Sequence, residues 1–206
     1  MYKKIFYSFI IINSTLKADD WPGWFGPERD GVWREEGILD KFPQKGPKTI
    51  WKAPVGRGYA GPAVADGKVY IMDRQIDKGA KSPENPFSKI TIPGNERLLC
   101  LDAKNGKIIW EKSYNCPYSI SYSAGPRTTP LIDENRVYTI GAEGNLYCRS
   151  TSDGKEIWST DFNTAFNVKT PTWGFSSTPL IYENLLICLA GGEGTVAVAF
   201  NKSDRK

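Results

Sequence analysis

Histidine is absent from the 206-residue sequence. Its absence excludes Ser-His-Asp and Cys-His nucleophilic sites, HExxH zinc sites and acid–base chemistry on imidazole. The four cysteines are never adjacent, and no apolar run approaches the about 18 residues that a membrane-spanning helix needs. We therefore expect no catalytic residue, no metal-ligand set and no membrane span, and the sequence leaves any cofactor-binding residue unknown.

The residues that are plentiful favour a β-rich globular protein. The sequence contains 20 Gly, 14 Pro and 7 Trp, with 40% hydrophobic and 24% charged residues. That balance is typical of a globular chain and not of a disordered one. Abundant glycine, proline and aromatic residues favour many short strands joined by tight turns.

Residues 1–18 have the pattern of a signal peptide. Lys3 and Lys4 form a positive start, residues 5–12 form a short apolar stretch, and Ala18 is a small residue before the expected cleavage point. The alternatives are a buried first strand or helix and, less in keeping with its length, a membrane anchor. The pattern predicts a periplasmic or secreted protein.

The net charge of +4 falls to about +1 once this segment is removed, because three lysines leave with it. A basic surface for nucleic acid therefore loses its main support, and we expect no nucleic-acid partner.

The sequence contains an internal repeat. Residues 98–110 match residues 146–158 at an offset of 48, and a Thr-Pro-Leu-Ile stretch occurs at 129–132 and again at 178–181. A further, weaker copy of that stretch begins at Gly61. The equivalent pairs in the first match are Cys100 with Cys148, Gly106 with Gly154, Lys107 with Lys155, and Trp110 with Trp158.

Each repeat is predicted to form four short antiparallel strands. In the second copy the expected strands are 129–132, 136–140, 145–150 and 156–159. Asn-Gly and Asp-Gly pairs between apolar residues are strong signals of hairpin turns. Four strands in about 40–50 residues match one blade of a β-propeller, and no 3.6-residue periodicity supports a helical solenoid.

The predicted organisation has three parts: a signal peptide at 1–18, a turn-rich aromatic segment at 19–45, and a partial propeller at 46–206. The repeat units lie near 61–114, 126–162 and 175–206. The first unit carries an insertion at 75–96, interpreted as a surface loop. Trp51 is interpreted as part of the last strand of an earlier unit.

The stretch from Leu101 to Trp110, Leu-Asp-Ala-Lys-Asn-Gly-Lys-Ile-Ile-Trp, resembles the tryptophan-docking repeat of the pyrroloquinoline-quinone-like (PQQ-like) β-propeller family. The second copy keeps Gly154, Lys155 and Trp158, whereas the third has Arg205 at the glycine position. The resemblance covers residues 21–206. It implies an all-β fold of about two complete four-stranded blades with partial flanking blades in an incomplete ring, and Trp110 and Trp158 that pack between blades.

The same resemblance implies two classes of function. Quinoprotein alcohol dehydrogenases of the family use a vicinal cysteine pair over the quinone and a calcium ion held by acidic and amide side chains. Neither feature is present here, so PQQ with calcium is expected only if the chain is a fragment of such an enzyme. Other members are non-catalytic, such as the lipoprotein of outer-membrane protein assembly.

Other candidate motifs have simpler interpretations. Residues 192–197 fit a GxGxxA pattern, but a strand-like stretch follows where a dinucleotide site needs a helix. Asp102 lacks the partners of a calcium loop and fits a hairpin turn. The basic residues of the insertion fit a solvated loop better than an anion site. Four aromatic residues in the inter-blade segments could line a ligand-binding face or pack between blades: Tyr118, Tyr122, Trp173 and Phe175.

Two structural expectations follow. Cys100 and Cys148 occupy equivalent places in adjacent blades, and sheets packed about 10 Å apart are too distant for a disulfide, so both are expected as buried free thiols. The chain is also expected to be incomplete as a folding unit, because a closed ring needs about 4–8 blades, and to aggregate or form oligomers in isolation.

The favoured function is a non-enzymatic scaffold or binding module that holds a protein or a polysaccharide through its blade-face loops. The alternative is a fragment of a quinone (PQQ)-dependent alcohol dehydrogenase.

Overall fold

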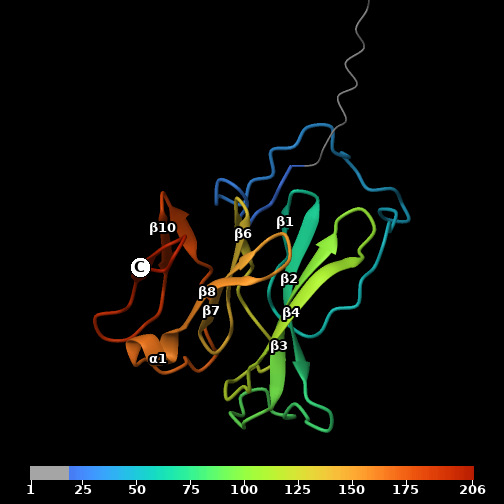
Figure 1. Ribbon diagram of the computed structural model, residues 1–206. Coiled ribbons are helices and arrows are strands. Elements are labelled where there is room, and N and C mark those ends of the chain that lie inside the picture. The colour runs from blue at the N-terminus through green and yellow to red at the C-terminus, as the bar shows by residue number, and fades with distance from the viewer. Residues whose placement is uncertain (1–18) are drawn as a thin grey trace, which may run out of the picture.

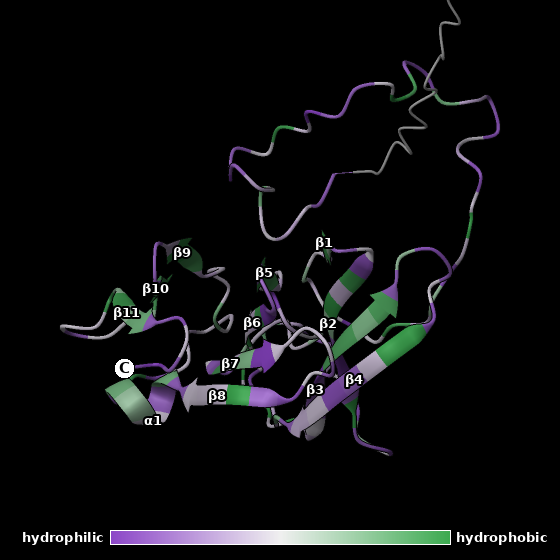
Figure 2. Cartoon of the chain, turned by 45° about the horizontal axis from the view of Figure 1, so that its top comes forward, coloured by the Kyte–Doolittle hydropathy of each residue, from purple (hydrophilic) through white to green (hydrophobic). Residues whose placement is uncertain are grey.

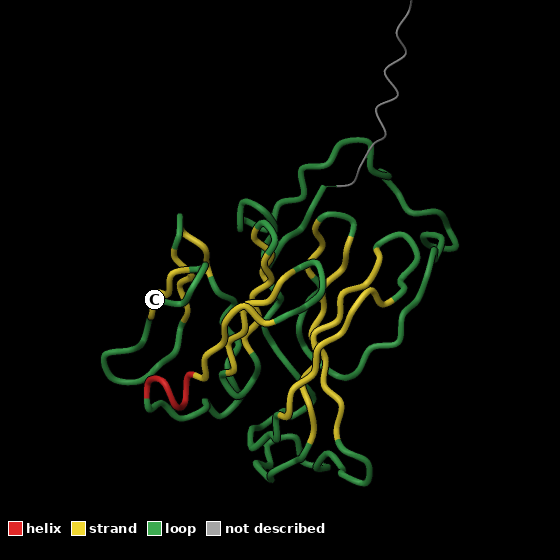
Figure 3. Tube along the Cα trace, in the orientation of Figure 1, coloured by secondary structure: helices red, strands yellow, loops and turns green. Residues whose placement is uncertain are grey.

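The computed structural model describes residues 19–206, which form three antiparallel sheets side by side (Figure 1). The predicted signal peptide, 1–18, lies outside the described residues. The fold is all-β and the three sheets do not close a ring. Its single described helix is the five-residue α1 (Phe162–Phe166), and Figure 3 shows strands and long connecting loops almost everywhere else.

The first sheet has the strand order β1-β2-β3-β4. Its strands are β1 (Ala63–Ala65), β2 (Lys68–Ile76), β3 (Gly94–Asp102) and β4 (Ile108–Asn115). Apolar residues at the start of β4 give way to polar ones further along (Figure 2). The insertion is shorter than predicted, at residues 77–93, because β2 and β3 continue to pair as far as Ile76 and Gly94.

The second sheet repeats this order as β5-β6-β7-β8. Strands β6 (Arg136–Ile140) and β7 (Asn145–Ser150) have the predicted bounds. Strand β5 (Leu131–Asp133) starts two residues later than expected, because Thr128 and Thr129 precede its pairing with β6. Strand β8 (Glu156–Asp161) runs two residues further.

The third sheet has three strands in the order β11-β10-β9. They are β9 (Leu180–Tyr182), β10 (Leu185–Cys188) and β11 (Val198–Asn201). Residues 189–197 connect β10 to β11, so the GxGxxA stretch belongs to a hairpin connection, as interpreted from the sequence. The strand begins at Val198, later than the sequence suggested.

A tryptophan from each of the first two units docks on the turn of the next unit. The Trp110 indole N–H donates to the Thr151 carbonyl at 3.1 Å, and that of Trp158 to the Lys202 carbonyl at 3.2 Å. Both side chains are over 90% buried. The same position in the third turn is Arg205, which adopts φ 69° where Gly106 and Gly154 have φ 71° and 69°. The repeat backbone is therefore kept even where the glycine is not.

Trp51 docks in the same way but not from a strand. Its indole N–H donates to the Ala103 carbonyl at 2.8 Å, and its ring lies against Gly106. The prediction of a strand around Trp51 was wrong, because a strand requires a hydrogen-bonded neighbour and no described segment pairs with it.

The hydrophobic core runs between the sheets. Tyr70, Cys100 and Trp110 are cross-strand neighbours in the first sheet, and Tyr138, Cys148 and Trp158 repeat that row in the second. All four cysteines are buried free thiols. Burial raises the pKa of Cys100 and Cys148 to about 11, which agrees with the expectation that they behave as small apolar side chains.

Candidate functional site

A depression of about 350 Å³ opens where the chain enters the three sheets. We call it the rim groove and define it by its lining residues, which are Tyr59, Tyr122, Arg127, Trp173 and Ser176. Three of these occupy equivalent places, each three residues before the proline that leads into an inner strand. They are Tyr59 before Pro62, Arg127 before Pro130 and Ser176 before Pro179.

Three further depressions adjoin the rim groove, and each shares some of its lining residues. One of about 340 Å³ continues past Trp173 to Leu189 and Val196, and one of about 170 Å³ continues past Tyr59 and Tyr122 to Arg57. The third, about 270 Å³, joins at Arg127 and Ser176. Together they form a continuous, shallow surface and not a single deep pocket.

The N-terminal segment borders this surface. Trp21 pairs with Val64 through two backbone hydrogen bonds of 2.8 and 2.9 Å, and the Pro22 carbonyl accepts from the Ile132 N–H. Arg29 then donates to the Pro179 carbonyl at 3.2 Å. The segment therefore crosses the inner edges of all three sheets, and it places Trp24 and Arg29 beside Arg127.

The four candidate aromatic residues separate into two pairs. Tyr118 and Phe175 are buried, at 0% and 5% exposure, and pack between blades. Tyr122 and Trp173 are 39% and 60% exposed and line the groove. Tyr59, 51% exposed, is a third groove aromatic that sequence analysis missed. Its signal was available, because the repeat register aligns it with Arg127 and Ser176.

Arg127 is fixed by its own loop. Its guanidinium donates to the carbonyls of Gly125, Ser121 and Tyr122, the last at 2.6 Å, and its carbon lies 5.2 Å from the centre of the Tyr59 ring. Burial lowers the pKa of Arg127 below its usual value, yet an arginine stays charged in proteins. The loop therefore holds the positively charged guanidinium of Arg127 in a fixed position in the groove.

Two buried charged residues of β2 hold the segments that carry these side chains. Asp73 and Arg74 are neighbours in the strand, so their side chains point to opposite faces of the sheet. Both are almost completely buried, at 1% and 2% exposure. Sequence analysis singled out neither residue, because their partners come from segments distant in sequence.

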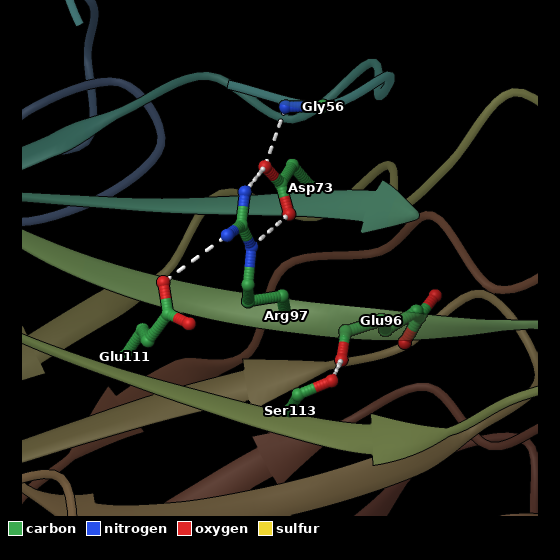
Figure 4. Close-up of polar contacts among 6 residues, drawn as sticks. All are labelled: Gly56, Asp73, Glu96, Arg97, Glu111 and Ser113. Carbon is green, nitrogen blue, oxygen red and sulfur yellow. Dashed lines mark hydrogen bonds and ion pairs between the residues drawn. The ribbon is translucent and has the colours of Figure 1, made fainter. Parts of the chain in front are cut away.

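Asp73 anchors the segment that carries Tyr59. Arg97 donates to both Asp73 oxygens, at 3.0 and 2.7 Å, and also to Glu111 at 3.1 Å. The Oδ2 oxygen of the same carboxylate also accepts from the Gly56 N–H at 2.5 Å (Figure 4). A paired, hydrogen-bonded carboxylate can be buried where an isolated one could not.

Arg74, on the other face, anchors the segment that carries Tyr122 and Arg127. Its guanidinium donates to the carbonyls of Ser123 at 3.0 Å and Ile92 at 2.6 Å, and lies 3.6 Å from the centre of the Tyr118 ring. The insertion and the inter-blade loop are thereby tied to the same side chain.

Glu96 lies opposite Arg74 in the register and completes this cluster. The hydroxyls of Tyr114 and Tyr118 donate to its carboxylate, as does the Ala142 N–H at 2.9 Å. Burial raises the pKa of Glu96 above its usual value, and the three donated hydrogen bonds act against that rise. The cluster joins the first blade to the turn of the second and does not open into the groove.

The residues do not fit the quinone and calcium of the dehydrogenases. No three acidic, cysteine or histidine residues within 19–206 lie close enough to hold a metal ion, and the four cysteines are separate and buried. Asp102 accepts from the Lys104 and Asn105 N–H groups at 2.8 and 3.1 Å, which is the predicted hairpin turn.

Comparison with known sequences identifies the family. Residues 94–206, just over half of the chain, match the family profile described as outer membrane protein assembly factor BamB. The chain belongs to this family, whose repeats are PQQ-like. Comparison with curated proteins gives no match.

The chain is also similar to solved structures, one of them with a TM-score above 0.5. Quinohemoprotein alcohol dehydrogenase from Comamonas testosteroni is 17% identical, with a TM-score of 0.52 over 82% of this chain and 22% of that one. The corresponding enzyme ADHIIG from Pseudomonas putida HK5 is 18% identical, with a TM-score of 0.47 over 76% and 21%. BamB from Moraxella catarrhalis is 13% identical, with a TM-score of 0.38 over 76% and 53%.

The chain spans about a fifth of the length of these two dehydrogenases. The similarity to the Comamonas testosteroni enzyme supports the β-propeller fold and says nothing about activity. Within residues 19–206, no helix has the length and apolar character to cross a membrane.

Proposed function

We propose that the chain is part of a secreted or periplasmic binding module without catalytic activity, and that its ligand lies in the rim groove. The observation that carries the proposal is the grouping of exposed aromatic side chains from consecutive inter-blade segments around a fixed arginine. Such rings can bury large areas on binding, and the arginine can orient a ligand.

The composition of the groove supports binding over catalysis. Its hydroxyl groups are those of Ser176, Tyr59 and Tyr122, and the groove supplies neither a histidine nor a carboxylate to accept a proton from them. General-base activation requires such a group within hydrogen-bond reach. A fragment of a quinone-dependent dehydrogenase remains the alternative, and it predicts stoichiometric quinone binding with calcium.

Localisation depends on residues 1–18, which we propose are removed as a signal peptide. In a bacterial host that exports the full chain, mass spectrometry should find a mature N-terminus near Asp19. An intact Met1 on exported protein would contradict this part of the proposal.

The binding proposal can be tested with Trp173→Ala and a matched control, Trp33→Ala. Both tryptophans are 60% exposed, but Trp33 lies outside the rim groove. The full chain and both variants are screened against arrays of oligosaccharides and peptides, and titrated with PQQ and calcium. We expect one ligand class to bind the wild type and Trp33→Ala with similar affinity. The affinity of the same ligand for Trp173→Ala should be at least about tenfold lower.

The proposal fails if no array ligand distinguishes Trp173→Ala from Trp33→Ala. Tight binding of PQQ with calcium would instead support the dehydrogenase alternative.

A further inference from the structure

The rim groove and its adjoining depressions carry positive charge that the protein does not neutralise. Arg29, Arg57 and Arg127 line them, and none forms an ion pair within residues 19–206. No aspartate or glutamate is among the lining residues. By contrast, four arginines elsewhere are paired with carboxylates: Arg34, Arg97, Arg136 and Arg149. Charge complementarity therefore favours an anionic ligand.

The protein partners of these arginines are neutral. Arg127 donates to three carbonyls, Arg29 donates to the Pro179 carbonyl, and Arg57 donates to the Ser82 hydroxyl at 3.4 Å. These bonds fix the guanidinium groups without cancelling their charge. A fixed guanidinium can still donate to a carboxylate, which is the partner that its fork geometry suits best.

The shape and the remaining side chains favour a sugar chain. The exposed aromatic side chains Tyr59, Tyr122 and Trp173 line the rim groove, and Trp24 lines the depression that joins it at Arg127. Ser176, Ser177 and Thr178 add hydroxyl-bearing side chains to the lining of that depression. Flat apolar surfaces, hydroxyls and cations in a shallow, extended groove match sugar rings that bear hydroxyl and carboxylate groups. Peptide anchors instead fill deep, desolvated pockets, and this surface has none.

We propose that the rim groove binds an acidic polysaccharide, a chain of uronic-acid units whose carboxylates are held by Arg127 and its neighbouring arginines. This inference rests on the proposed function, since it names the ligand class of the same site.

The test is calorimetric titration of the full chain with three oligomers of similar length: oligogalacturonate, a neutral cello-oligosaccharide and oligoglutamate. We expect oligogalacturonate to bind, to weaken as salt is raised, and to bind better than the other two. Arg127→Gln should lose at least about tenfold in affinity. Arg127→Lys, which keeps the charge but not the fork, should lose less. Arg136→Gln, an arginine outside the groove, is the control.

Unchanged thermal melting of each variant establishes that it is folded. Equal binding of the neutral oligomer, or unchanged affinity of Arg127→Gln, overturns the inference. Preferential binding of oligoglutamate also overturns it, and indicates an acidic protein partner. If another ligand class still depends on Trp173, the binding function stands and only the ligand class fails. If no ligand depends on Trp173, both fail.

Discussion

The first and second blades have the same structure at one end and different structures at the other. At the shared end, each has a Tyr-Cys-Trp cross-strand row, and its turn receives a tryptophan from the preceding unit. At the other end, the second blade closes with a turn at 141–144. The first blade instead extends β2 and β3 by several residue pairs and adds the insertion.

The extension places charged residues where the second blade has a tight turn. Arg74 and Glu96 face each other across β2 and β3, and Glu96 accepts from Ala142 in the turn of the second blade. The longer hairpin of the first blade, β2-β3, therefore contacts the β6-β7 turn of the second blade. Repeated positions build the propeller, whereas the positions at which the repeats differ support the segments of the rim groove.

The largest expected effect tests the shared end. Replacing Trp110 or Trp158 with Ala removes a buried indole and its hydrogen bond, so each should lower the free energy of unfolding by about 3–5 kcal/mol. Ile109→Ala, on a half-exposed side chain of the same strand, should change it by less than about 0.5 kcal/mol. Urea denaturation measures all three. A much smaller loss for one tryptophan would show that the two docking sites are not equivalent.

The next effect tests the contact between the two blades. A Cβ at Gly141 would meet the Glu96 carboxylate and the Tyr114 hydroxyl, the latter at 2.5 Å. Gly141→Ala should therefore destabilise the protein by about 1–3 kcal/mol through overpacking.

The double-mutant cycle with Glu96→Ala is its control. Glu96→Ala vacates the space, so the cost of Gly141→Ala should fall in that background, and the two effects should be non-additive. Additive losses would mean that the blades do not meet at this point.

The smallest effect concerns the pH dependence of stability. The folded-state pKa of Glu96 is raised above its ordinary value of 4.5. Its contribution to stability is therefore complete below about pH 4.5 and is lost as pH rises through the folded-state pKa. Relative to the wild type, Glu96→Gln should become more stable as pH increases, by at most about 1.4 kcal/mol per pH unit.

Chemical denaturation between pH 4 and pH 8 measures this slope, with Glu134→Gln, which removes an exposed carboxylate, as the matched control. A wild type and Glu96→Gln that change in parallel with pH would rule out the buried carboxylate as the source.

The sequence by itself determined the repeat, the hairpin turns, the docking of Trp110 and Trp158, and the burial of Cys100 and Cys148. These depend on apolar patterning and turn residues within one unit of about 50 residues, and the pattern repeats. Arg205 shows the strength of that determination, because the turn keeps its backbone without glycine.

Only the tertiary structure decided what lies together at the rim groove. Sequence analysis placed Glu96 in a surface loop and singled out neither Asp73 nor Arg74, because the cost of burying a charge depends on partners that approach from other strands and from the next blade. Tyr59, Arg127 and Trp173 are separated by more than 40 residues from one to the next, and they meet only because each unit enters its sheet at the same end. Local pattern fixes the blade, whereas a shared surface forms only where loops from successive blades converge.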